Sequence, residues 1–407
     1  MVIAIPQLPP ISAVATSQTS QAINGQVQLG EVLSTQTLDV DAVSDQTTAE
    51  TSATGNTYSA AVEAGDVNVQ STQSMQGNAG ATATLNVTTD AGLQVSMTTE
   101  GTGNTAEADT LGGGALTGTF RQDTGPVSIT SESQINADAA QAGDLTVSTN
   151  AIANTQGLGA IGGTVDGTVT QTSQALTQSN SGAILQVASG TATFSALAVS
   201  NNVTATGTDG SSQTVSVNQS MTGARTQAAQ FLAVGEVQTL VNGVTATGNN
   251  VSVTNDGAEL NVTTVQDNES YLRAQAETTA FQFGLSSTVA TGVGNSVMAG
   301  ETSGDVNVDN TQTNGGAGIQ VSAASAGTDG YDLSSSATAM GNAVTGFACS
   351  LCGGRMTVTN SQTNSADVSA TSSLSLGAGT GGSARSATGV ATAVGNSATF
   401  YVSKPGG

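Results

Sequence analysis

The chain contains no histidine and only one lysine, Lys404, close to its C-terminus. Without histidine, the sequence cannot build a Ser-His-Asp triad or ligate a metal through imidazole. A lysine so near the end of the chain cannot belong to a Walker phosphate-binding loop. These absences exclude triad hydrolases, imidazole-ligated metal enzymes and Walker-type nucleotidases.

Charged residues are also scarce, at 9% of the chain against the roughly 25% of an average soluble protein. Nearly all of them are acidic, with 29 acids against 6 bases and a net charge of −23. A charge of this sign and size keeps a chain in solution and repels polyanions. The composition therefore argues against nucleic acid or an anionic membrane face as the partner.

Long apolar runs are missing as well. No stretch approaches the ~20 consecutive apolar residues that a membrane-spanning helix needs. The opening residues MVIAIPQLPP carry no base, and the first base of the chain is Arg121, so they do not predict an intact signal peptide. A secreted protein numbered from its mature start would begin in this way, and we expect a secreted chain.

Proline is rare too, at 5 residues, whereas small polar residues and glycine abound. Such a composition leaves disorder as an alternative. The abundance of Val and Thr, however, favours strands, because β-branched residues fit a pleated, half-buried surface and are scarce in disordered chains.

One short sequence occurs twice in the chain in nearly the same form. GDVNVQSTQ occupies residues 65–73 and GDVNVDNTQ occupies residues 304–312, which lie 239 residues later. Upstream of each copy an asparagine precedes the final glutamine by 17 residues, and this spacing recurs approximately along the chain. The asparagine anchors read from it are Asn56, Asn104, Asn154, Asn202, Asn249, Asn295, Asn342 and Asn396. The sequence therefore predicts a repeat of about 48 residues.

Within each unit the apolar residues alternate with polar ones, as Val67 and Val69 do, and Val306 and Val308. Alternation predicts strands with one face in a core and one in water. Small inward side chains suit a narrow core, and we expect an all-β parallel solenoid of one or two coils per unit. Stacked antiparallel hairpins are the alternative. We expect residues 1–50 to form a partial repeat or cap, 51–397 about seven repeats, and 398–407 an edge strand and tail.

Chemistry-bearing patterns are weak. GLGAIG at Gly157 and GAGTGG at Gly377 match GxGxxG, but neither opens a helix after a strand, as a nucleotide-binding loop would. The acids and arginines are scattered singly along the chain, so we expect no enzyme, and a polysaccharide lyase or hydrolase is the weakest alternative. Asp305, Asn307 and Asp309 share one strand face and could hold Ca²⁺. A solvated polar face is the favoured interpretation, and we expect no cofactor.

The only cysteines, Cys349 and Cys352, lie in an enlargement of the unit that holds them. Zinc would need two further ligands, for which the chain has no other cysteine or histidine. We expect a local disulfide, with a free thiol pair as the alternative.

The acidic composition, the Asn and Gln anchors and repeat segments such as SATAMGN (336–342), VTNSQTNSADVSA (358–370) and VATAVGNSATF (390–400) together resemble the holdfast anchor protein family of stalked bacteria, in particular its HfaD-like members. The resemblance implies an extracellular protein at the cell surface, attached to the outer membrane, that fastens an adhesive polysaccharide holdfast to the cell. It also implies an HfaA-like amyloid-like protein and an HfaB-like outer-membrane secretion component as partners. Contact with the polysaccharide would be direct or indirect.

The residues themselves favour a catalytically empty structural or adhesion protein, and they leave a homo-oligomer or filament open. The alternative is an extracellular solenoid that binds glycans or other ligands, as in a biofilm matrix or a surface layer. Thr is abundant, but no threonine ladder recurs in register in every unit. Tyr58, Tyr271 and Tyr331 are too few for an aromatic platform on which sugar rings could stack.

The C-terminal segment NSATFYVSKPGG holds the only adjacent aromatics, Phe400 and Tyr401, with Lys404 as its one charge. We expect Ala398, Thr399, Phe400, Tyr401, Val402 and Ser403 to form an edge strand that docks a partner by strand addition. The alternative is that the two aromatic residues plug the chain's own open core.

Overall fold

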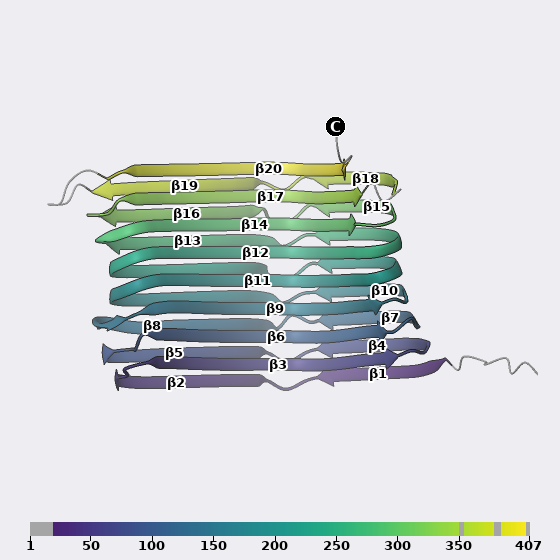
Figure 1. Ribbon diagram of the computed structural model, residues 1–407, viewed down its shortest axis with the longest axis horizontal. Helices are drawn as coiled ribbons and strands as arrows, with labels where there is room; N and C mark the ends of the chain where they lie inside the picture. Colours follow the sequence, from purple (N-terminus) through teal and green to yellow (C-terminus); the bar gives the residue numbers. More distant parts are fainter. Residues whose placement is uncertain (1–18, 350–353, 378–383, 404–407) are drawn as a thin grey trace, which may run out of the picture.

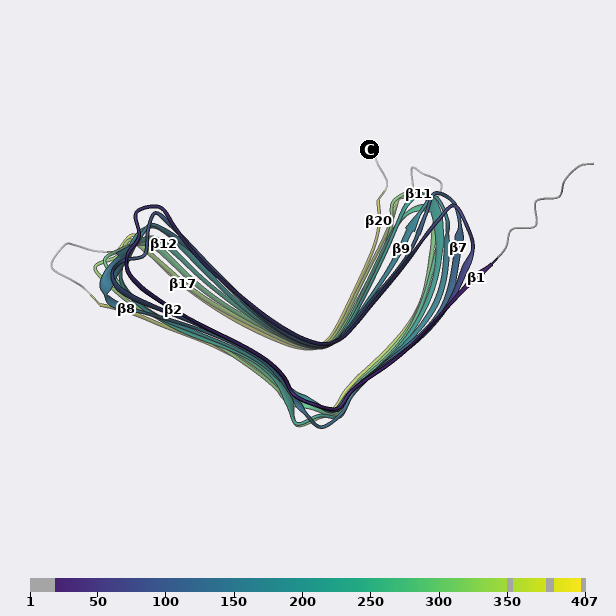
Figure 2. The same ribbon diagram turned by 90° about the horizontal axis from the view of Figure 1, so that it is seen from below.

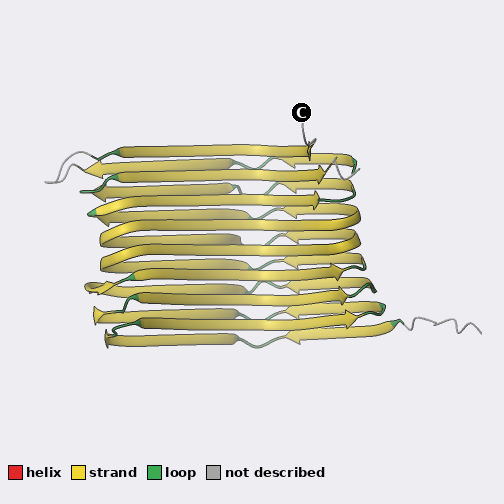
Figure 3. Cartoon of the chain, viewed as in Figure 1, coloured by secondary structure: helices red, strands yellow, loops and turns green. Residues whose placement is uncertain are grey.

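The computed structural model describes residues 19–349, 354–377 and 384–403. In this part of the chain, 20 strands form one sheet in which each strand pairing is parallel, and there is no helix (Figure 3). The sheet winds upon itself, coil upon coil, so that the expected parallel β-solenoid is confirmed (Figure 1). The stacked antiparallel hairpins are wrong.

One coil is formed by β1 (Ser20–Gln28), β2 (Val32–Ala42) and β3 (Gln46–Glu63). The chain then returns, and the next three strands lie in register on these: β4 (Val67–Met75) on β1, β5 (Ala79–Asp90) on β2 and β6 (Gln94–Leu111) on β3. We call the three positions within a coil the A, B and C strands. Each repeat unit is thus a single coil, and the two-coil alternative is wrong.

Eight coils stack in this way, and seven spacings of ~4.8 Å give a stack about 34 Å high. In two places the strand pairing continues around the turns, so β11 and β12 each cover parts of two coils. The other strands are β7 (Ala115–Thr124), β8 (Ser128–Ala142), β9 (Asp144–Ile161), β10 (Thr164–Ser173), β11 (Leu176–Met221), β12 (Arg225–Asn268), β13 (Tyr271–Phe281), β14 (Phe283–Glu301), β15 (Asp305–Asn314), β16 (Ile319–Thr328), β17 (Asp332–Cys349), β18 (Met356–Asn364), β19 (Val368–Gly377) and β20 (Ser386–Ser403).

The domain boundaries expected from the sequence do not coincide with strand ends. β3 runs from Gln46 to Glu63 without interruption at residue 50, and the first coil has all three strands. In the same way β20 runs from Ser386 to Ser403, through residue 397. Residues 20–50 and 398–403 thus belong to coils of the solenoid, and the division of the whole chain into domains stays a prediction.

Seen along the stack, each coil is V-shaped (Figure 2). The long C strands form the inner side of the V and bend at its vertex, while the B strands cover the outer side of one arm and the A strands that of the other. We call these the B arm and the A arm. Each arm is two strands thick, which explains why the side chains inside are small.

The A arm holds the repeated motif of the sequence. Val306 and Val308 are buried, and they stack on Leu260 and Val262 of the coil before and on Met356 and Val358 of the coil after. Val67 and Val69 lie at the same positions five coils earlier, in one continuous apolar cluster. The predicted inward orientation of these valines is confirmed.

The bend of each C strand coincides with the recurring Gly-Asn pair. The residue before the asparagine, such as Gly294, has no partner in the register of neighbouring coils. A Cβ at Gly294 would lie 2.5 Å from the carbonyl oxygen of Gly341, closer than a Cβ can approach. Glycine thus lets adjacent coils approach at the vertex, which explains its recurrence there.

Candidate functional surfaces

Two ladders of amides, buried in the middle of the stack, run along the vertex from the first coil to the last. In one ladder each asparagine Nδ2 donates to the Oδ1 of the asparagine in the following coil, over 2.7–2.8 Å. Each Nδ2 also donates to a backbone carbonyl of the facing A strand. Its members are Asn56, Asn104, Asn154, Asn201, Asn249, Asn295, Asn342 and Asn396.

One anchor read from the sequence is wrong. Asn201, not Asn202, lies in the ladder, because the bend of that coil places Asn201 inside and Asn202 on the outer face. The other anchors occupy matching positions, as predicted.

The second ladder has the opposite polarity. From the second coil on, each glutamine Nε2 donates to the Oε1 of the glutamine in the preceding coil, over 2.7–2.9 Å. It also donates to a carbonyl oxygen of the C strand just past the asparagine. Its members are Gln26, Gln73, Gln122, Gln171, Gln219, Gln266, Gln312 and Gln362. Buried amides with their hydrogen-bond partners in place fix the register between coils. The conspicuous Asn and Gln residues therefore have structural roles.

The most deeply buried acid is structural too. Glu301 has no exposed surface, and its Oε2 accepts a hydrogen bond from Asn255 Nδ2 at 2.6 Å. Its Oε1 accepts hydrogen bonds from the backbone N–H groups of Gly257, Ser303 and Gly304 at 3.0–3.2 Å. Four donors compensate the burial of the charge and hold the turn at the tip of the A arm.

No arrangement for catalysis was found among the described residues. They contain no cluster of three His, Cys, Asp or Glu side chains that could hold a metal ion. Burial, with a smaller effect of Glu107, raises the pKa of Asp109. Both carboxyls lie on one face of β6 and point the same way, instead of flanking a substrate from two sides as glycosidase acids do.

The GLGAIG segment passes beside this same acid. A Cβ at Gly159 would meet Asp109 Oδ1 at 2.1 Å, so the carboxylate of one coil lies across the glycine of the next. Gly162 has a φ of +65°, in the turn that follows. Turn geometry favours glycine at Gly162, Gly159 leaves room for the Asp109 side chain, and no helix follows them.

The side chains proposed for Ca²⁺ have other partners. Asp305 accepts hydrogen bonds from the backbone N–H of Arg355 at 2.8 Å and from its guanidinium at 3.4 Å. Asn307 Nδ2 donates to Asn261 Oδ1 at 2.8 Å, and Asp309 is exposed. These contacts do not test calcium binding, which stays an expectation.

Of the two cysteines, the described part of the chain includes Cys349. Cys349 ends β17, and no described cysteine is a free thiol. Cys352 lies outside the described residues, so the pairing of Cys349 with Cys352 stays a prediction.

The C-terminal segment lies in the last coil, as expected. Ala398, Thr399, Phe400, Tyr401, Val402 and Ser403 belong to β20, which pairs with β17 on one side, and no described strand covers its other side. Phe400 lies over Gly346 of the preceding coil, where a plug of the core would lie, whereas Tyr401 is 63% exposed. Docking of a partner here stays a prediction.

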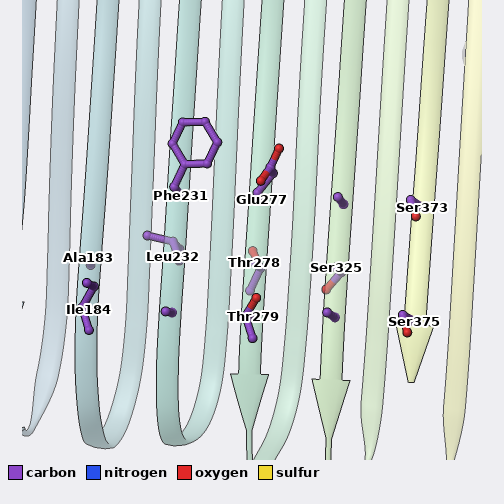
Figure 4. A pocket seen from close by; sticks show the side chains of 13 residues that line it. Ala183, Ile184, Phe231, Leu232, Glu277, Thr278, Thr279, Ser325, Ser373 and Ser375 are labelled. Atoms are coloured by element: carbon purple, nitrogen blue, oxygen red, sulfur yellow. The ribbon is translucent and has the colours of Figure 1, made fainter. Parts of the chain in front are cut away.

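A surface feature that the sequence reading missed lies on the outer face of the B arm. Phe231 and Ile184 are 48% and 47% exposed there and line two shallow hollows of about 400 and 510 Å³. Figure 4 shows the side chains that line the first of these hollows. The hollows exist because neighbouring coils carry small residues at the same outward positions, such as Gly182 and Ala324. Glu277 and Gln134 add polar groups at the margins. Side chains alternate between the two faces of a strand, so burial of Leu232 places Phe231 on the outer face. This alternation is the sequence signal that could have revealed Phe231.

None of the described residues forms a helix that could cross a membrane. Comparison with known proteins gives one result: a model of the family described as holdfast attachment protein D, HfaD, matches residues 40–318 and 328–405. No curated protein and no solved structure matches the chain.

Proposed function

Because the chain belongs to the holdfast attachment protein D family, we propose that it is a non-catalytic structural protein that fastens an adhesive polysaccharide holdfast to the outer membrane. The role of the family is holdfast attachment at the cell surface. The stacked coils, joined by two amide ladders, supply a stiff spacer for that role. The observation that carries the proposal is the family match over most of the chain.

The proposed partners are the holdfast polysaccharide, an HfaA-like amyloid-like protein and an HfaB-like outer-membrane secretion component. The negative charge disfavours direct binding to anionic lipid, so protein partners are the better candidates for holding the chain at the membrane.

For direct contact with the polysaccharide, the candidate is the outer face of the B arm around Phe231. An exposed aromatic ring beside a hollow with hydroxyl and carboxylate groups offers an apolar face for a sugar ring and hydrogen-bond partners for its hydroxyls. This observation keeps a glycan-binding solenoid as the second candidate function.

The test is holdfast retention by cells of the bacterium that produces this chain. Deleting the gene should cause cells to shed their holdfasts, which can be counted on glass after rinsing with a fluorescent lectin as the stain. Unchanged retention would contradict the attachment role. Phe231→Ala should increase shedding if this face binds the polysaccharide, whereas Phe281→Ala, which removes a similarly exposed ring at the end of β13, should not. Equal behaviour of the two variants would exclude the Phe231 face.

A further inference from the structure

The two end coils expose their core. Most inward apolar residues are buried in the middle of the stack, but the end coils hold the partly buried ones that pack against the main clusters: Ala22, Leu38, Val40, Tyr58, Ala60 and Val62 at one end, and Met356, Val358, Val368, Ala370, Leu374 and Leu376 at the other. In the described structure β1, β2 and β3 pair on one side only, and so do β18, β19 and β20. Long, flat, unpaired strands of this kind are templates for pairing with another chain.

The two ends also match each other in length and register. β18 and β1 both have 9 residues, and β20 and β3 both have 18. Following one row of the sheet from coil to coil leads from Leu38 to Leu374, both of which face the core. A second copy placed on the last coil in the same register would put its Leu38 on Leu374.

The polarity of the ladders makes this match directional. At the first coil, no described residue donates to Asn56 Oδ1, and Gln26 Nε2 donates only to the Thr57 carbonyl. At the last coil, no described residue donates to Gln362 Oε1, and Asn396 Nδ2 has only a long bond of 3.5 Å to a carbonyl. Asn56 of the first coil thus offers an acceptor where Asn396 of the last coil offers a donor. Gln26 of the first coil offers a donor where Gln362 of the last coil offers an acceptor. If two first coils met face to face, the Asn56 Oδ1 acceptor of one copy would meet the same acceptor of the other and no donor.

Charge favours the same pairing. The first coil carries six acids and no base: Glu31, Asp39, Asp41, Asp45, Glu50 and Glu63. The last coil contains Arg355 and Arg385 against one acid, Asp367. In continued register Arg385 would lie opposite Asp45 of the next copy, while Asp367 would face Glu31 as the one like-charged pair. Opposite net charges on the two ends steer them together and repel like ends.

We propose that copies of this chain stack head to tail, the first coil of one on the last coil of another, so that the sheet, the apolar core and both amide ladders continue from copy to copy. Such a contact joins two different surfaces and does not close, so it generates a filament. The partner of the predicted edge strand Ala398–Ser403 is then β3 of a second copy. The proposal does not depend on the holdfast role, and its test uses purified protein alone.

The first experiment blocks each end separately by placing a charge in the inward-facing row that leads from Leu38 to Leu374. Leu38→Asp and Leu374→Asp should each be monomeric by sedimentation velocity, while the wild-type chain forms longer species as its concentration rises. The control Leu33→Asp makes the same change on the same strand, but on the outer face, where Leu33 is 65% exposed, and it should assemble like the wild type.

A mixture of the two blocked variants then tests the direction. Leu38→Asp retains an open last coil and Leu374→Asp an open first coil, so equal amounts should form a dimer and nothing longer. A dimer formed by either variant alone would mean that like ends meet. Continued assembly of both variants would mean that the contact lies elsewhere. Either result overturns the proposal, and so does a wild-type chain that stays monomeric.

A cross-link tests the register without altering the core. Thr48 and Thr388 belong to one row on the exposed face of the C strands. The double variant Thr48→Cys/Thr388→Cys should give a ladder of disulfide-linked species after oxidation, because paired strands bring Cα atoms within disulfide range. The offset pair Thr48→Cys/Thr392→Cys and both single variants should not. Equal cross-linking of the offset pair would overturn the register.

Discussion

Asn249→Asp should destabilise the solenoid by about 4–5 kcal/mol at neutral pH, the cost of leaving a carboxylate unpaired in a site with no exposed surface. Asn249 Nδ2 donates to Asn295 Oδ1 at 2.8 Å and to the Asp267 carbonyl at 2.9 Å. A carboxylate in its place would turn an acceptor toward two acceptors. Denaturant unfolding followed by circular dichroism measures the loss.

The adjacent residue supplies the control. Asn250 lies on the outer face and donates to Asn202 Oδ1 at 2.8 Å, where water can solvate a charge. Asn250→Asp should therefore cost less than about 1 kcal/mol. Similar losses for the two variants would mean that the ladder does not hold the coils in register.

The loss in Asn249→Asp should also depend on pH. Burial holds the pKa of the new carboxyl above its unfolded value of about 3.9, so the folded state binds the proton more tightly. Stability should therefore fall as the pH rises above about 4 and recover below it, where both states are protonated. Circular dichroism melts between pH 3 and pH 7, compared with those of the wild type, measure this trend.

Val306→Asp should cost roughly 3–5 kcal/mol, because the charge would enter the apolar interior of the A arm between Leu260 and Met356. Two strands enclose this interior, so water cannot reach the carboxylate without separating them. In a stack whose coils contact only their neighbours, the damage should be greatest in the adjacent coils. Hydrogen exchange should accordingly quicken in β12, β15 and β18 before it does in β4.

Asn307→Asp is the matched control, since it adds the same charge one residue later on the outer face of β15. It should leave unfolding nearly unchanged. If Val306→Asp were equally harmless, the inward orientation of the repeated motif would be wrong.

The repeat could be predicted because every coil requires the same types of residue at the same positions. Each coil needs one asparagine and one glutamine at the vertex, and alternating apolar residues in each arm, so spacing and alternation reveal both period and fold. The error at Asn202 has the same origin. Two adjacent asparagines satisfy the spacing equally well, and only the bend of the backbone decides that Asn201 points inward.

Other features leave no periodic signal. The V-shaped coil depends on where the C strand bends, and a coil of about 48 residues can enclose many shapes (Figure 2). In the sequence Glu301 is one of many scattered acids, because its donors come from the backbone of turns and from Asn255, which lies one coil earlier and 46 residues away. The hollows beside Phe231 depend on which small residues from distant segments become neighbours.

The central claim is that each unit of about 48 residues adds one coil to a single stack, and a distance measurement tests it most directly. Ser52 and Thr291 lie in one row of the C strands, five coils apart. Spin labels attached there through non-natural ketone residues avoid the cysteines, and an excess of unlabelled protein suppresses distances between copies. Pulsed electron–electron resonance should give a narrow distribution near 24 Å, five spacings of ~4.8 Å. A distance near 48 Å, as for two coils per unit, or a broad distribution would contradict the account.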